Sequence, residues 1–150
     1  GARLPGEEGL KPVAPPWLTS GVERAADDPY QIQRFGEMRV QWLAAEALAD
    51  RAIQRLDRAW RKGAALTADE RAEVSLFTAE AKVAAHRAAL FISQEMFEAT
   101  GARSTKAALA LDRFWRNART HTLHDPIDYK TRELGAWVLQ GRLPEPGFYA

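Results

Sequence analysis

The densest group of side chains that could do chemistry lies just before a proline, at the end of a predicted helix. It contains His121, His124 and Asp125. Two histidines three residues apart share a helix face and could bind a metal. A metal site, however, needs three or four ligands with carboxylate support, and the sequence has no Glu-x-x-His pair. We therefore predict no metal site, and on local sequence alone these residues could equally be exposed histidines favoured by the negative end of a helix dipole.

A second candidate site is the turn from Thr100 to Thr105. Here Gly101, Arg103 and Ser104 bring N–H groups, a hydroxyl and a guanidinium to the start of the next predicted helix. Hydrogen-bond donors and a positive charge in this arrangement can bind an anion, particularly a phosphate. The alternative is an ordinary connection, because a glycine followed by a serine N-cap also joins helices that bind nothing.

A basic ridge follows, formed by Arg113, Arg116 and Arg119 at steps of three. It could meet phosphates or carboxylates, or it could be a solvated face with ion pairs, for instance to Asp112. The third histidine, His86, stands among alanines in the middle of a predicted helix and is expected to be structural.

Four helices must position these residues. Capping patterns, glycines and prolines predict helices over 28–62, 67–100, 104–123 and 126–140. The second helix begins with a capping box from Thr67 to Glu70, and Gly63 and Gly141 end the first and fourth helices.

Apolar residues at helical spacing mark the faces expected to pack. The stripe of the first helix is Phe35, Met38, Trp42, Ala45, Ala49, Ala52, Leu56 and Trp60. The stripe of the second is Val74, Phe77, Ala81, Ala84, Ala88 and Phe91. No strand pattern competes, so we predict an all-α antiparallel bundle over residues 28–150, preceded by an extended Pro-rich arm over residues 1–27.

Composition excludes several classes of protein. A net charge of +1 gives no support for nucleic-acid binding, and the absence of cysteine excludes disulfides and thiolate sites. The sequence shows neither a signal-peptide core nor a run of about 20 apolar residues that could span a membrane. We expect a cytoplasmic protein without a membrane partner.

From about Pro16 to Tyr149 the sequence resembles the C-terminal domain of acyl-CoA dehydrogenases, and most closely the flavin monooxygenase branch that acts on dibenzothiophene and sulfones. Three segments carry the resemblance. They are Glu23-Arg24-Ala25-Ala26-Asp27-Asp28-Pro29-Tyr30, Phe97-Glu98-Ala99-Thr100-Gly101-Ala102-Arg103-Ser104, and Leu111-Asp112-Arg113-Phe114-Trp115-Arg116-Asn117-Ala118-Arg119-Thr120-His121-Thr122-Leu123-His124-Asp125-Pro126.

The third segment also carries the clearest departure from the dehydrogenases. Their Tyr-Glu-Gly-Thr type motif, whose glutamate removes the substrate α-proton, is replaced here by Leu123-His124-Asp125-Pro126. A shorter carboxylate before a rigid proline is a poor copy of that base. The monooxygenase branch therefore fits better than a dehydrogenase that uses FAD.

The resemblance to that branch implies a cofactor and roles for single residues. Reduced FMN, supplied by a separate flavin reductase, reacts with oxygen to give a flavin C4a-hydroperoxide that oxygenates a small organic, and possibly organosulfur, substrate. His124 would protonate or hydrogen-bond the peroxide, with His121 as second choice and with Asn117 and Asp125 in support. The resemblance also implies that Gly101, Arg103, Ser104 and the ridge residue Arg116 would bind the flavin phosphate, with the turn offered to a neighbouring subunit as in the family's tetramers. We expect the turn to lie beside the His121–Asp125 segment.

The family's flavin rests between this bundle, a helical N-terminal domain and a β-barrel, and neither of the other two domains is expected within these residues. The chain alone is therefore expected to lack tight FMN binding and turnover. The resemblance implies assembly into a homo-oligomer, a tetramer in the family. A helical oligomerisation module without catalysis is the alternative from a different class of function.

Overall fold

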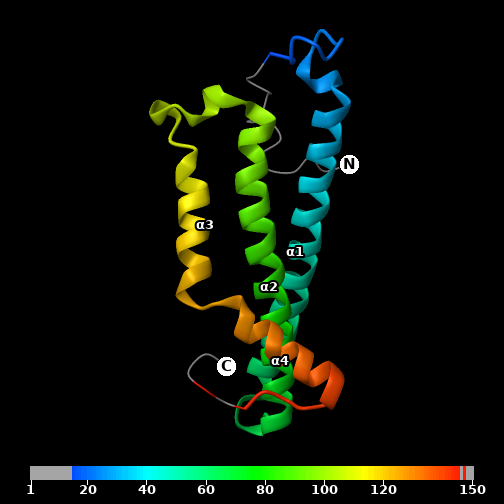
Figure 1. The fold of residues 1–150 in the computed structure, drawn as a ribbon. Coiled ribbons are helices and arrows are strands. Elements are labelled where there is room, and N and C mark those ends of the chain that lie inside the picture. The colour runs from blue at the N-terminus through cyan, green and yellow to red at the C-terminus, as the bar shows by residue number, and fades with distance from the viewer. Residues whose placement is uncertain (1–14, 146, 148–150) are drawn as a thin grey trace.

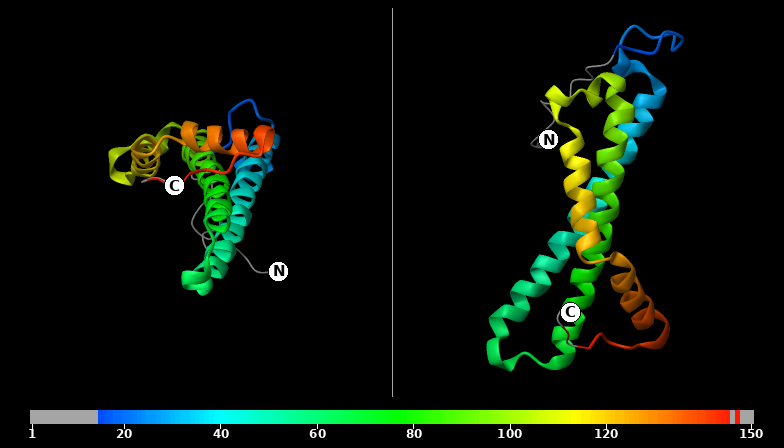
Figure 2. Two further views of the ribbon diagram at one scale, coloured as in Figure 1. Left: turned by 90° about the horizontal axis from the view of Figure 1, so that it is seen from below. Right: turned by 60° about the vertical axis from the view of Figure 1, so that its left-hand side comes forward.

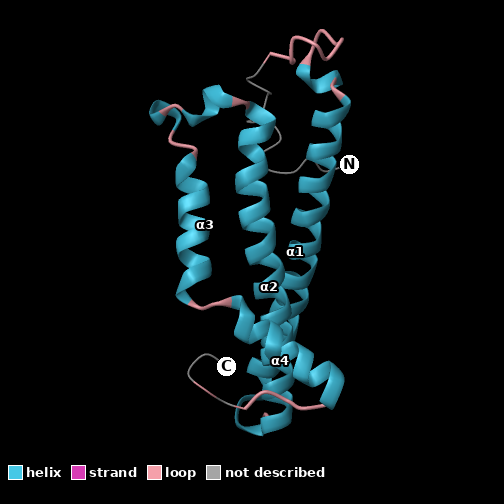
Figure 3. Cartoon of the chain, viewed as in Figure 1, coloured by secondary structure: helices cyan, strands magenta, loops and turns pink. Residues whose placement is uncertain are grey.

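The computed structural model describes residues 15–145 and 147, and within them every regular element is a helix (Figures 1 and 3). The four α-helices are α1 (Pro29–Lys62), α2 (Ala68–Thr100), α3 (Asp112–His124) and α4 (Ile127–Gln140). Short 3-10 helices occupy Ala25–Asp27, Gly63–Ala65, Ala102–Thr105 and Ala107–Leu109. The predicted all-α bundle of four helices is confirmed.

Local capping explains where the two long helices begin. The Asp28 side chain accepts a hydrogen bond from the backbone N–H of Tyr30 at 2.9 Å, and Pro29 takes the first helical position. At the start of α2 the Thr67 hydroxyl accepts from the backbone N–H of Glu70, and the Glu70 carboxylate accepts from the backbone N–H of Thr67. The first N–H groups of a helix have no carbonyl partner within the helix, and these side chains supply one. The predicted starts of α1 and α2 are therefore confirmed.

Helix α2 is the centre of the bundle. It runs antiparallel to α1 and contacts α3, α4 and the 3-10 turn Ala102–Thr105 as well. The ribbon views place α1 and α3 on opposite sides of α2, with α4 crossing the N-terminal part of α2 (Figures 1 and 2). Helix α2 therefore packs on several sides, and its buried residues are the ones that can contact α3 and the α3–α4 connection.

The buried face of α2 has the predicted rhythm but a different register. Of the six residues in the predicted stripe, only Ala88 is buried. Five of the buried residues lie two positions along from predicted ones, namely Leu76, Ala79, Val83, His86 and Ser93. Ala72, Ala99 and Thr100 of α2 are buried as well. The predicted register was wrong because α2 carries apolar residues on most of its circumference, and packing against α1, α3 and α4 together selects the face.

The stripe predicted on α1 is only partly covered. Ala52 is buried, whereas Trp42, Leu56 and Trp60 stay between 53% and 83% exposed. The core uses small side chains, since Ala79 and Ala99 are among the most buried residues at 2% exposure. The large aromatic side chains Trp42 and Trp60 of α1 stay exposed.

The third helix begins later than predicted. The expected start at Ser104 is wrong, because residues 102–109 form two 3-10 turns and α3 begins at Asp112. The hydroxyls of Ser104 and Thr105 each donate to the carbonyl three residues earlier, which offers the backbone an alternative to an α-helix. Ala110 then adopts the left-handed conformation, with φ at 48°, which separates these turns from α3.

The Pro-rich arm lies mainly outside the described residues. Residues 15–24 form turns and bends without a helix, and Ala25–Asp27 is a short 3-10 turn. The division into an arm over 1–27 and a bundle over 28–150 stays a prediction. Among the described helices none is long and apolar enough to cross a membrane.

Candidate functional site

The His121–Asp125 segment forms a corner between α3 and α4, which we call the histidine corner. His121 and His124 lie in the last turn of α3 and are exposed, and Asp125 caps that helix with extended backbone angles. Asn117 is also exposed and lies one turn before His121 on the same side of α3. The corner therefore presents an amide and two imidazoles along one face, next to a carboxylate.

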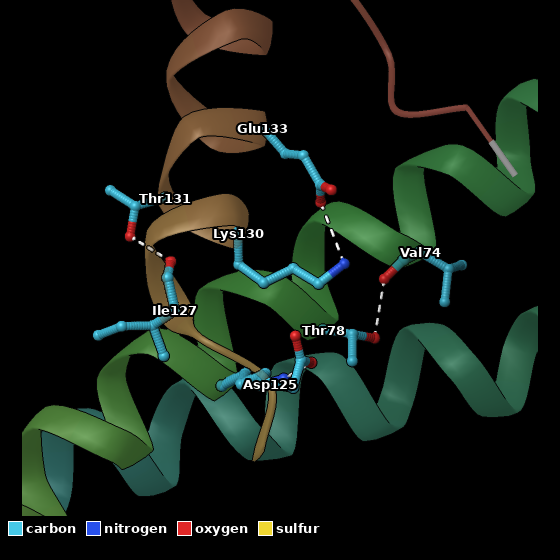
Figure 4. Close-up of polar contacts among 8 residues, drawn as sticks. Val74, Thr78, Asp125, Ile127, Lys130, Thr131 and Glu133 are labelled. Atoms are coloured by element: carbon cyan, nitrogen blue, oxygen red, sulfur yellow. Dashed lines mark hydrogen bonds and ion pairs between the residues drawn. The ribbon is translucent and has the colours of Figure 1, made fainter. Parts of the chain in front are cut away.

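An ion pair holds the carboxylate of the corner. Asp125 pairs with Lys82 of α2, and both side chains are about three-quarters buried. Nearby, the Lys130 ammonium of α4 lies 3.2 Å from the Glu133 carboxylate (Figure 4). Burial, followed by the positive charge of Lys130, lowers the pKa of Lys82, while Glu133 acts in the opposite direction. Lys82, Asp125 and Lys130 line a cavity of about 400 Å³, which residues of α1, α2 and 144–145 also line.

A second contact joins α2 to the corner through two rings. The imidazoles of His86 and His121 meet edge to face, with centroids 5.2 Å apart and planes at 81°. His86 is only 4% exposed, and neither ring nitrogen has a hydrogen-bond partner among the described residues. An unsatisfied buried polar group costs about 1–3 kcal/mol, so a purely apolar side chain would serve packing better. Burial, then His121 and Lys82, lower the pKa of His86.

The buried imidazole of His86 predicts a loss of stability in acid. Because its pKa is lowered from 6.5 in the folded chain, the unfolded chain binds more protons below that pH. The free energy of unfolding should therefore fall as the pH decreases from about 7 to about 5. Urea denaturation across this range measures the slope, and His86→Phe, which keeps a ring but removes the titration, should flatten it.

His124→Gln is the matched control for this slope, since it removes an exposed histidine and leaves His86 in place. In this variant the free energy of unfolding should depend on pH as it does in the wild-type chain. An equal slope in wild type and in His86→Phe would contradict the assignment of the acid sensitivity to His86.

The Thr100–Thr105 turn offers less to an anion than its residue types suggest. The Gly101 N–H donates to the Phe97 carbonyl, and both the N–H and the hydroxyl of Ser104 donate to the Gly101 carbonyl. Ser104 is also 4% exposed. Arg103, by contrast, is exposed, so its guanidinium is the group of this turn that fits a phosphate best.

The structure separates the turn from the histidine corner. The turn precedes the first residue of α3 and the corner ends that helix, so its 13 residues, about 20 Å, lie between them (Figure 1). Within one chain the turn therefore does not lie beside the corner as expected, because the whole of α3 separates them. The expected contribution of the turn to a neighbouring subunit stays a prediction. Arg116 lies between the two clusters, exposed and 3.1 Å from Asp112.

An apolar groove of about 850 Å³ runs along the same part of the molecule. Residues of α1, α2 and α3 line it, including Trp42, Ile92, Met96 and Phe114. In the described part of the chain, no three histidine, aspartate or glutamate side chains gather as they would around a metal.

Sequence reasoning missed Lys82 and took His86 for a structural residue. The available signal was their spacing, since residues four apart share a helix face. A polar residue on the buried face of an Ala-rich helix indicates a functional site more strongly than an exposed polar residue does. The signal could not be used here, because the sequence did not show which face of α2 is buried.

Comparison with known proteins shows matches over nearly the whole chain. A family model described as acyl-CoA dehydrogenase, C-terminal domain, matches residues 16–129. The chain is 48% identical over 135 residues to the probable FMNH2-dependent monooxygenase SfnC of Pseudomonas putida, and the match covers 90% of this chain and 34% of that protein. It is 47% identical over 148 residues to a dibenzothiophene monooxygenase of Mycolicibacterium goodii, covering 99% of this chain and 36% of the relative.

Among solved structures, the methanesulfinate monooxygenase MsuC from Pseudomonas fluorescens superposes with a TM-score of 0.89 at 49% identity, covering 91% of this chain and 35% of MsuC. The chain thus spans about a third of the length of these relatives.

Proposed function

The chain belongs to the acyl-CoA dehydrogenase C-terminal domain family, and from this premise we propose that it is the helical bundle of an FMN-dependent, two-component monooxygenase. The substrate would be a small organic molecule, and the names of the relatives favour an organosulfur compound. The reduced flavin would come from a separate reductase.

The observation that carries this proposal is the chemistry of the histidine corner. Where dehydrogenases of the family have a Tyr-Glu pair, this chain has His124 and Asp125. The Asp125 carboxylate is engaged by Lys82 and so is not free to remove a substrate proton. His124 is exposed at the end of α3, and its imidazole forms no hydrogen bond or ion pair within the described residues. The corner is therefore better equipped for proton donation by an imidazole than for α-proton removal by a carboxylate.

The residues of the corner fit a flavin ring by their donor chemistry. When bound, reduced FMN supplies two electrons and the ring position C4a at which oxygen is activated. His124 would hold and deliver a proton at an imidazole nitrogen, Nδ1 or Nε2. His121 is the second candidate for that role, and Asn117 would orient the reacting groups by hydrogen bonding.

The phosphate end of the flavin would be met by Arg103, with Gly101 and Ser104 shaping its turn and Arg116 as a second cation. Because α3 separates Arg103 from His124, we propose that the two serve different flavins in a homo-oligomer. The exposed aromatic surface of α1 and the apolar groove provide surface for such contacts. Sedimentation of the chain alone would report self-association directly.

A chimera tests the function. Replacing the matching third of the Mycolicibacterium goodii dibenzothiophene monooxygenase by this chain keeps the other segments of that relative. With reduced FMN, a reductase and oxygen, the chimera should oxygenate dibenzothiophene at a rate within about tenfold of its parent, a difference of ~1.4 kcal/mol in activation free energy. A folded chimera that binds FMN yet forms no oxygenated product would contradict the proposal and favour a non-catalytic oligomerisation module.

A further inference from the structure

We propose that Lys82 and His86 of α2 are positioning residues that fix the place and orientation of His124. The proposal rests on the proposed function for the chemistry of the corner. The positioning itself is a property of this chain and can be tested without any turnover.

Lys82 and His86 lie one turn apart on α2 and point to the same side of that helix, toward α3 and the α3–α4 connection. Lys82 pairs with Asp125, and His86 contacts the ring of His121. The two contacts fall on either side of His124 in the chain. His124 is therefore held at both ends while its own side chain stays exposed.

The contact to Asp125 fixes the backbone that follows His124. Asp125 has extended angles, φ −143° and ψ 94°, and the next residue is Pro126 with φ at −60°. A proline restricts the residue before it to extended conformations. Because the backbone at Asp125 has little conformational freedom, the ion pair to Lys82 fixes the position of the last turn of α3 relative to α2.

The contact to His121 fixes the helix that precedes His124. His121 and His124 are three residues apart and share a face of α3. An edge-to-face ring contact has a preferred geometry, so it limits rotation of α3 about its axis. His86 is buried beneath this contact with both nitrogens unpaired among the described residues, which favours a role in orientation over one in polar bonding.

The variants are chosen to separate positioning from general stability. Lys82→Met removes the ion pair while keeping an unbranched side chain, and Lys82→Arg restores the charge. His86→Phe keeps a ring against His121. Arg87→Met is the matched control, since it removes a cation from an exposed position of the same helix.

The first measurement uses the chain itself. It contains three histidines, so long-range 1H–15N spectra show three imidazoles that single substitutions assign. Lys82→Met should shift the His124 imidazole and its neighbouring amides, Lys82→Arg should return them toward wild type, and Arg87→Met should leave them in place. Unmoved His124 signals in Lys82→Met would overturn the proposal.

The second measurement uses the chimera with dibenzothiophene monooxygenase. Lys82→Met should lower kcat about 10- to 100-fold with little change in KM, since a small misplacement of a reacting group carries a cost of that order. Lys82→Arg should recover most of the rate. Equal losses of kcat in Lys82→Met and Arg87→Met would overturn the positioning role. So would a loss of kcat no larger than the fraction of unfolded protein in the Lys82→Met sample.

The two measurements also distinguish this proposal from the proposed function. If the folded chimera binds FMN but forms no oxygenated product, the proposed function fails, and the spectra of the chain alone decide whether Lys82 positions the corner. If His124→Ala abolishes turnover while Lys82→Met shifts the spectra and leaves kcat unchanged, the proposed function stands and the positioning proposal fails.

Discussion

Replacing His124 by alanine in the chimera should lower the rate of oxygenation by about 100- to 10,000-fold, the range that a positioned acid or base contributes. His124 lies exposed at the end of α3 with an anchored carboxylate beside it. Removing the imidazole removes the proton donor but leaves Arg103 and the groove in place, so FMN affinity should change little. Single-turnover oxygenation and a flavin titration measure the two quantities separately.

Thr120→Ala is the matched control for this substitution, because Thr120 is exposed on the same helix and lies outside the proposed site. It should leave the rate within about twofold, the effect of a change of up to ~0.5 kcal/mol. A loss in His121→Ala larger than that in His124→Ala would transfer the proton-donating role to His121. Unchanged oxygenation in both histidine variants would contradict the assignment of the corner.

Replacing Leu76 by alanine should lower the free energy of unfolding by about 2–5 kcal/mol, the cost of deleting a large buried side chain and leaving a cavity. Leu76 is 3% exposed and lies on the buried face of α2. Domain stabilities are typically about 5–15 kcal/mol, so this single change should shift the urea midpoint strongly. Equilibrium denaturation followed by far-UV circular dichroism measures it.

The same substitution at Leu139 provides the control, because this residue of α4 is 84% exposed. It should change the free energy of unfolding by less than about 0.5 kcal/mol. Comparable losses at Leu76 and Leu139 would mean that the face of α2 described here is not the one that packs in solution.

The ends of α1, α2 and α4 can be predicted from short stretches of sequence. Each depends on residues only a few positions apart, such as the reciprocal bonds between Thr67 and Glu70 or the positive φ of Gly63 and Gly141. Such local bonds do not depend on how the helices pack against one another. The residue types of the corner and the replacement of the dehydrogenase base were equally readable, because they are properties of a short segment.

The buried face of α2, the first residue of α3 and the contacts of the histidine corner depend instead on how the helices pack together. An Ala-rich helix offers several faces of similar hydrophobicity, so its neighbours in space select the register. The Lys82–Asp125 and His86–His121 contacts join segments far apart in the chain. No local spacing encodes them, since they exist only once α3 and α4 have packed against α2.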